Sequence, residues 1–309
     1  MDTEALKQEI IRLKQEKKAV IFAHYYQDDD IQQVADVIGD SLALARKAAE
    51  TDSQTIVLCG VHFMGETAAI LCPDKKVLVP DPAAGCSLAD SCQADDLKRF
   101  IEAHPGHTVI SYVNTSAAVK ALTDVVVTSS NAVRIVNSFP KDEKIIFGPD
   151  RNLGAWINRL TGRQMLLWDG GCHVHESFSL PRILELRKRY PEALLIAHPE
   201  CKAEITDLAD SVGSTADLIR FVETDPARSF IVATEAGVLF EMKRRCPEKT
   251  FIPAPARDDA PCALCDHMRL CTLEKLYRCL LDGEPEIRVD AELAGKALRP
   301  IRRMLELSK

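Results

Sequence analysis

The sequence has few aromatic residues, no long apolar run and no cluster of basic residues. Aromatic side chains make up 6% of the 309 residues and hydrophobic residues 46%, so the core must be mainly aliphatic, as in parallel sheets buried on both faces. No apolar run approaches the ~20 residues of a membrane-spanning helix, and the charged N-terminus lacks the apolar segment of a secretory signal. The 39 Lys and Arg residues are scattered and the net charge is −7, which argues against a nucleic-acid-binding surface. We therefore expect a cytoplasmic protein without membrane or nucleic-acid partners.

The chain also lacks the usual cysteine patterns of metal and redox proteins, although it contains 11 Cys. There is no C-x₂-C-x₂-C run of the ferredoxin kind. Cys262 and Cys265 form a lone CxxC, with neither a second pair for a zinc site nor a thioredoxin-like context. A disulfide framework is not expected in a cytosolic chain. A specific role for the cysteines must therefore come from another arrangement.

That arrangement is a threefold internal repeat, in which each copy closes on a cysteine. The copies open on the apolar segments at 19–26, 108–115 and 194–201. Matching positions carry polar residues: His24, Tyr112 and His198 at the end of the first segment, Ser41, Ser129 and Ser214 at a helix start, and Cys86, Cys172 and Cys265 at the close. Self-similarity at a regular interval indicates that one structural unit is repeated.

Each copy reads as strands that alternate with helices and end in a cysteine loop. This alternation predicts parallel sheets with helices on both faces. We predict an α/β fold of three pseudo-equivalent αβα domains around a pseudo-threefold axis, with the carboxyl ends of the strands facing the centre. The expected domains are 1–86, 87–172, and 173–309, the last of which includes a C-terminal helical tail.

Cys86, Cys172 and Cys265 are candidate metal ligands because they lie in glycine- or proline-rich loops, where packing does not require sulfur. Zinc accepts three cysteines and a histidine, and His175 lies three residues after Cys172. A [4Fe–4S] cluster on three cysteines would instead leave one iron open to substrate as a Lewis acid. The residues alone leave zinc and iron–sulfur open.

Pairs of polar residues at positions i and i+2 follow the opening strand of each copy, so both side chains of a pair point the same way. His, Tyr and Glu transfer protons when their neighbours tune them. Helix starts bind phosphate and carboxylate without Lys or Arg, although their hydroxyl groups also serve as simple N-caps. The polar residues of the loops at Gly65–Glu66 and Thr234–Glu235 are equally consistent with lining the functional site and with facing solvent. The strand-end pairs are His24 and Tyr26, Tyr112 and Asn114, and His198 and Glu200; the helix starts are Asp40–Ser41, Thr128–Ser130 and Gly213–Thr215.

Over nearly its whole length the chain closely resembles the quinolinate synthases, the A proteins of NAD biosynthesis. The motifs that carry the resemblance are AHYYQ, GDSL, DPAAGCSLAD, SYVNT, TSSNA, GPDRNLG, GCHVHE, AHPEC, GST and ATE, in this order. The resemblance implies three αβα domains about a pseudo-threefold axis and a [4Fe–4S] cluster on Cys86, Cys172 and Cys265. It also implies a transferase that condenses iminoaspartate with dihydroxyacetone phosphate to quinolinate, with loss of phosphate and water. The L-aspartate oxidase that supplies iminoaspartate is then a candidate partner.

The resemblance also implies which residues line the site. The expected substrate-binding residues are His24, Ser41, Tyr112, Asn114, Ser129, His198, Glu200, Ser214 and Thr215. Tyr112 and Glu200 are our first candidates for proton transfer, and His24, Tyr26 and His175 are further catalytic candidates.

The sequence leaves two alternative functions open and differs from the family's pattern at two positions. A zinc-dependent lyase or hydrolase could use the same cavity, and an iron–sulfur redox sensor could be built on Cys262 and Cys265. Some family members carry CxxCxxC where this chain has Asp259 at the first position. Cys271 stands where a polar amide is common. Neither departure removes a proposed ligand.

Overall fold

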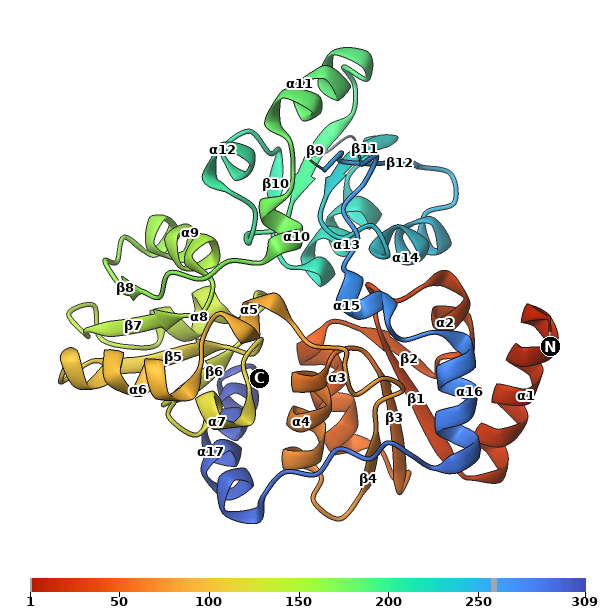
Figure 1. The fold of residues 1–309 in the computed structure, drawn as a ribbon. Coiled ribbons are helices and arrows are strands. Elements are labelled where there is room, and N and C mark those ends of the chain that lie inside the picture. Colours follow the sequence, from red (N-terminus) through yellow and green to blue (C-terminus); the bar gives the residue numbers. More distant parts are fainter. Residues whose placement is uncertain (1, 257–259) are drawn as a thin grey trace.

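Within the described residues, 2–256 and 260–309, the chain forms three four-stranded parallel sheets. The computed structural model places them around a common centre (Figure 1). Their strand orders are β2-β1-β3-β4, β6-β5-β7-β8 and β10-β9-β11-β12, so all three have the same topology. This confirms the predicted α/β fold of three αβα units.

The first unit alternates strictly between helix and strand. Its α1 is amphipathic, begins where the Asp2 carboxylate accepts the N–H of Ala5 at 2.8 Å, and buries Leu6, Ile10 and Leu13. The elements are α1 (Thr3–Glu16), β1 (Ala19–His24), α2 (Asp29–Val34), β2 (Val37–Gly39), α3 (Ser41–Glu50), β3 (Thr55–Cys59), α4 (His62–Leu71) and β4 (Lys76–Leu78).

The second and third units repeat this order. The second contains α6 (Ala94–Ala103), β5 (Thr108–Tyr112), α7 (Ala117–Lys120), β6 (Val125–Val127), α8 (Ala132–Asn137), β7 (Ile145–Gly148), α9 (Arg151–Thr161) and β8 (Leu166–Leu167). The third contains α11 (Leu180–Arg189), β9 (Leu194–Ala197), α12 (Ala203–Thr206), β10 (Ser211–Val212), α13 (Thr215–Thr224), β11 (Ser229–Ala233), α14 (Val238–Arg245) and β12 (Thr250–Pro253). Each unit is followed by a short helix, α5 (Ser87–Asp90), α10 (His173–Glu176) or α15 (Asp266–Arg269).

An aspartate before the second strand makes the same hydrogen bonds in each unit. Asp36, Asp124 and Asp210 accept the N–H of Ile21, Val109 and Leu195 at 2.8, 2.8 and 2.7 Å. Each aspartate N–H in turn donates to the carbonyl of the same partner. The three units therefore share side-chain contacts as well as topology.

The C-terminal tail leaves the third unit. Helix α16 (Leu273–Asp282) packs on α1, and α17 (Ala291–Leu307) packs on β6, α7 and α4 of the other two units (Figure 1). The apolar face of α17 completes a core shared by the first and second units, which buries Ala297, Ile301 and Met304. The boundaries at 86 and 172 stay predictions. Throughout the described ranges, no helix combines the length and apolar character that crossing a membrane requires.

Candidate active site

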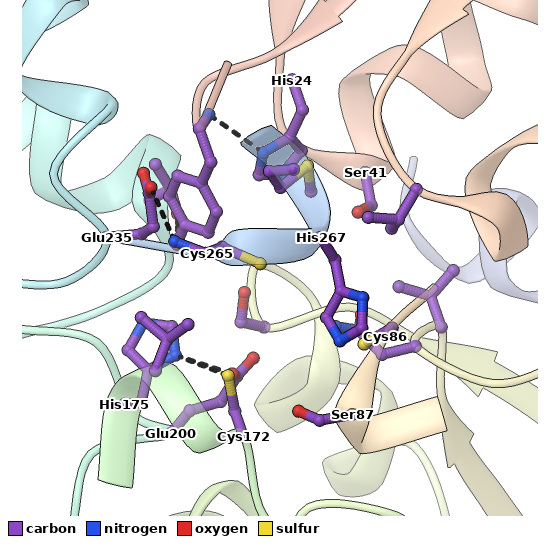
Figure 2. A pocket seen from close by; sticks show the side chains of 18 of the residues that line it. His24, Ser41, Cys86, Ser87, Cys172, His175, Glu200, Glu235, Cys265 and His267 are labelled. Atoms are coloured by element: carbon purple, nitrogen blue, oxygen red, sulfur yellow. Dashed lines mark hydrogen bonds and ion pairs between the residues drawn. The ribbon is translucent and has the colours of Figure 1, made fainter. Parts of the chain in front are cut away.

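The carboxyl ends of the three sheets border one cavity. Figure 2 shows side chains from all three units around it. The sequence-predicted residues on its wall are His24, Tyr26, Ser41, Cys86, Tyr112, Asn114, Ser129, Cys172, His175, His198, Glu200, Thr215 and Cys265. The threefold arrangement thus brings together residues that lie far apart in the sequence.

The three cysteines occupy equivalent positions. Cys86, Cys172 and Cys265 are the N-cap residues of the four-residue helices α5, α10 and α15, and Figure 2 shows them on three sides of the same space. Burial raises the pKa of Cys86 to about 12 and that of Cys265 to about 11. Burial also raises the pKa of Cys172, and the charges of Glu200 and Cys86 add to this rise.

This set of donors fits a thiolate-bound metal. Ionising three half-buried thiols around one cavity requires a cation to offset desolvation and mutual repulsion. Sulfur ligands favour zinc, copper(I) and iron–sulfur centres over magnesium or calcium. The arrangement of Cys86, Cys172 and Cys265 therefore suits either of the two metal centres that the sequence left open.

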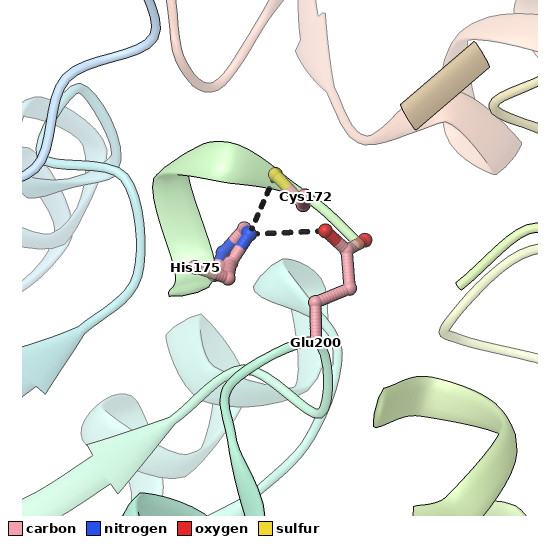
Figure 3. A group of neighbouring side chains, drawn as sticks. All are labelled: Cys172, His175 and Glu200. Atoms are coloured by element: carbon pink, nitrogen blue, oxygen red, sulfur yellow. Dashed lines mark hydrogen bonds and ion pairs between the residues drawn. The ribbon is translucent and has the colours of Figure 1, made fainter. Parts of the chain in front are cut away.

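Cys172, His175 and Glu200 form a second group in the same cavity, with one potential ligand atom each within 4.8 Å of the others (Figure 3). His175 Nδ1 lies 3.3 Å from Cys172 Sγ and 3.0 Å from Glu200 Oε2. His175 Nε2 lies 3.0 Å from Thr234 Oγ1, so both ring nitrogens have polar partners within the protein. A zinc site with His175 as the fourth ligand beside the three cysteines would take Cys172 and His175 from this group.

Tyr112 and Glu200 form a short polar contact between the second and third units on the cavity wall. Tyr112 Oη donates to Glu200 Oε1 at 2.6 Å, and both residues are buried. Burial opposes ionisation of Glu200, but its contacts with His175 and Tyr112 outweigh this effect and lower its pKa to about 2. Burial and the Glu200 charge raise the pKa of Tyr112. The pair therefore consists of a carboxylate and a protonated phenol.

Further polar contacts connect the Tyr112–Glu200 pair, through His175, to hydroxyl groups of the first and third units. Thr234 Oγ1, which faces His175, lies 3.0 Å from Tyr26 Oη. Tyr26 Oη in turn lies 2.8 Å from Thr215 Oγ1. Hydrogen bonds thus connect all three units from Tyr112 to Thr215. Thr234 is the link that the sequence left undecided.

His24 and His198 share one tautomer at equivalent strand ends. His24 Nδ1 accepts the N–H of Tyr26 at 3.2 Å, and His198 Nδ1 accepts that of Glu200 at 3.3 Å. Burial lowers the pKa of His24 to about 4 and that of His198 to about 3. Both rings are therefore neutral at pH 7 with the proton on Nε2, which makes them hydrogen-bond donors. His198 Nε2 lies 3.3 Å from Ser129 Oγ.

Ser214 differs from the prediction. It is the N-cap of α13, and its hydroxyl group is engaged in a capping box with Asp217, to which it donates at 2.6 Å. Of the two predicted neighbours, Thr215 is among the described residues on the cavity wall and Ser214 is not. The matching cap in the first unit is Asp40, which leaves the hydroxyl group of Ser41 on the wall. The sequence alignment of the repeats was therefore one residue out of register here.

The sequence missed Ser87, His173 and His267, which also line the cavity. Ser87 Oγ lies 2.6 Å from His173 Nδ1. Each of them lies one or two positions after a candidate cysteine ligand. This proximity in the sequence could have identified them as site residues. Glu235 lies on the wall, and burial raises its pKa to about 8. Glu66, by contrast, accepts the N–H of Ala117 at 3.0 Å.

The other cysteines lie elsewhere. Cys271 is fully buried in the core with Cys59 and Cys279. Cys262 is half-buried and is not among the described residues that line the cavity. Asp259 lies outside the described residues.

Comparison with known proteins agrees with this geometry. A family model described as "Quinolinate synthetase A protein" matches residues 8–306. The chain belongs to the quinolinate synthase family. It is 57% identical over 297 residues to quinolinate synthase from Thermosynechococcus vestitus, covering 96% of this chain and 93% of the relative. The corresponding enzymes of Microcystis aeruginosa and Chlorobaculum tepidum are 54% identical over 299 residues and 52% over 308, covering 97% and 100% of this chain and 94% and 96% of the relatives. The resemblance predicted from the motifs is confirmed.

Proposed function

We propose that the protein condenses iminoaspartate with dihydroxyacetone phosphate to form quinolinate, releasing phosphate and water. Family membership supports this activity. The observation that carries it is the convergence of one cysteine and one strand-end pair from each unit on a single cavity. The comparisons do not support the zinc-dependent lyase or hydrolase, because the relatives compared are named quinolinate synthase.

Cys86, Cys172 and Cys265 would hold a [4Fe–4S] cluster in which the fourth iron has no protein thiolate. When bound, this cluster supplies a Lewis acid that polarises a substrate hydroxyl or carboxylate group. Two features support this assignment: the cysteines have equivalent positions in the repeat, and each comes from a different unit.

Neutral donors on the wall suit two anionic substrates. His24 and His198 present Nε2–H groups, and Ser41, Ser129 and Asn114 add uncharged polar groups. Such groups hold carboxylate and phosphate oxygens without forming tight ion pairs that would have to be broken at product release. Thr215, at the first position of α13, would add the backbone dipole of a helix start.

Glu200 is a carboxylate that can accept a proton, and Tyr112 is a phenol that can donate one. The reaction needs proton transfer at the imine and at the leaving hydroxyl group, and a carboxylate 2.6 Å from a phenol provides both partners. His175, Thr234 and Tyr26 continue the hydrogen-bond chain and can orient Glu200. We further propose a cytoplasmic location and supply of iminoaspartate by L-aspartate oxidase, both on the basis of the resemblance.

The test is quinolinate formation by anaerobically purified protein that has been stripped of metal and reconstituted in two ways. One sample receives iron, sulfide and reductant, and the other receives zinc. We expect quinolinate from iminoaspartate and dihydroxyacetone phosphate in the first sample alone. Activity in the zinc sample, with none in the iron–sulfide sample, would overturn the proposal.

A further inference from the structure

A backbone hydrogen bond holds each cysteine segment in the same way. In every unit, the third residue after the third strand (β3, β7 or β11) donates its N–H to the carbonyl of the residue two positions before the cysteine. The three bonds are His62 to Ala84 at 2.6 Å, Arg151 to Gly170 at 2.9 Å, and Ala236 to Ala263 at 3.0 Å. The loop after the third strand is therefore the support on which each cysteine segment rests.

In two of the units this loop also contributes a buried carboxylate. Asp150 Oδ2 accepts the N–H of Cys172 at 3.3 Å, and Glu235 Oε1 accepts the N–H of Cys265 at 3.1 Å (Figure 2 shows the second contact). Asp150 and Glu235 each lie two residues after their strand and are 0% exposed. In the first unit the same position is Val61, which is buried and apolar.

The second oxygen of each carboxylate binds the loop itself. Asp150 Oδ1 accepts the N–H of Leu153 at 2.7 Å, and Glu235 Oε2 accepts that of Gly237 at 2.6 Å. Each carboxylate thus joins its loop to the main chain of a cysteine with two hydrogen bonds. A buried carboxyl group is costly unless it is hydrogen-bonded, so these contacts explain how the protein tolerates both groups.

Helix capping does not account for these residues. Asp150 is the N-cap of α9, but capping uses only the oxygen that faces Leu153. Glu235 precedes α14, whose N-cap is Gly237 and has no side-chain cap. Arg269 Nη2 lies 3.8 Å from Glu235 Oε1 and also pairs with Asp28 of the first unit. The contact between Glu235 and Cys265 therefore lies where the third unit meets the first.

We propose that Asp150 and Glu235 are positioning residues that fix the main chain at Cys172 and Cys265, so that both thiolates face the metal centre. This inference rests on the proposed function, because it assumes that these cysteines bind the cluster. Partners in the shell around metal ligands are known to orient them, and their loss typically reduces metal affinity by about 10–100-fold.

The test compares Asp150→Ala and Glu235→Ala with the wild-type protein and with Glu241→Gln. Glu241 is a matched control, because it is a buried carboxylate of the third unit that pairs with Arg244 and Arg245 on its own helix. Each protein is reconstituted anaerobically, and we measure iron and sulfide content, iron release to a chelator, and the EPR spectrum of the reduced cluster. We expect the two alanine variants to release iron about 10-fold faster or more and to show altered spectra, while the control matches wild type.

Amide variants separate positioning from folding. Asp150→Asn and Glu235→Gln keep one accepting oxygen, so they should release iron at rates between those of wild type and the alanine variants. Wild-type release rates and spectra in both alanine variants, or in both amide variants if the alanine variants do not fold, would overturn the inference. A wild-type protein that takes up no iron and sulfide would instead overturn the proposed function.

Discussion

Replacing Tyr112 by phenylalanine removes one oxygen atom from the cavity wall. That atom donates to Glu200 Oε1 at 2.6 Å, and both residues are buried. A hydrogen bond to a charged group contributes about 1.5–3 kcal/mol, and 1.36 kcal/mol corresponds to a tenfold change in rate. Loss of this bond alone would therefore slow the reaction by about 10- to 150-fold.

Proton transfer by Tyr112 predicts a larger effect. General acid–base catalysis typically contributes ~10²–10⁴-fold, and its loss lowers kcat without raising KM. We therefore expect Tyr112→Phe to lower kcat by more than about 150-fold, with both KM values close to wild type. Glu200→Gln removes the accepting carboxylate and should lower kcat within the same range.

The assay is steady-state formation of quinolinate under anaerobic conditions, with iron and sulfide content verified for each variant. Tyr25→Phe is the matched control, because Tyr25 is also a buried tyrosine but belongs to a hydrophobic cluster rather than to the described cavity wall. Near wild-type turnover of both Tyr112→Phe and Glu200→Gln at saturating substrate would refute the proton-transfer roles. A fall in kcat of only about 10- to 150-fold for Tyr112→Phe would indicate that it only orients Glu200.

Three further predictions concern substrate binding, oxygen and pH. Ser41→Ala and Ser129→Ala should raise KM more than they lower kcat, since these hydroxyl groups would bind anions; an unchanged KM in both variants would contradict this role. Activity should decay in air and return with iron, sulfide and reductant, and full aerobic activity of metal-stripped protein would exclude a required cluster. Burial lowers the pKa of Lys120 from 10.5 to about 8. The unfolded chain therefore binds this proton more tightly, and Lys120 alone should contribute about 3 kcal/mol of added stability to the cluster-free protein as the pH rises between these values. The buried thiols act in the opposite sense, because their pKa values are raised, so the test is the difference between two proteins. Urea unfolding over this pH range should show that Lys120→Met lacks the Lys120 contribution, and the same pH dependence in the variant and the wild type would contradict the assignment.

The repeat predicted the fold because each of the three units has to bury a parallel sheet on both faces. Strands buried on both faces need aliphatic runs, and the polar residues that follow them must lie at one edge of a parallel sheet. His24, Tyr112 and Glu200 were found on this basis, since strand direction alone brings them to the centre. The cysteines were found for the same reason.

Other features depend on contacts that spacing does not encode. Ser214 and Thr215 are adjacent, and only the capping box with Asp217 decides which hydroxyl group reaches the cavity. Asp150 resembles an ordinary helix cap in the sequence, and its contact with Cys172 requires the folding of a segment 22 residues away. The return of α16 and α17 to the first two units likewise depends on apolar surfaces that are formed only after the sheets assemble.

The central claim is that three cysteines, one from each unit, together hold a [4Fe–4S] cluster. It is tested most directly by the iron and acid-labile sulfide content of anaerobically reconstituted Cys172→Ala, with Cys262→Ala as the control from outside the described cavity wall. Wild-type protein and Cys262→Ala should bind about four iron and four sulfide ions per chain, and Cys172→Ala should bind almost none. Full iron and sulfide content in Cys172→Ala would contradict the claim.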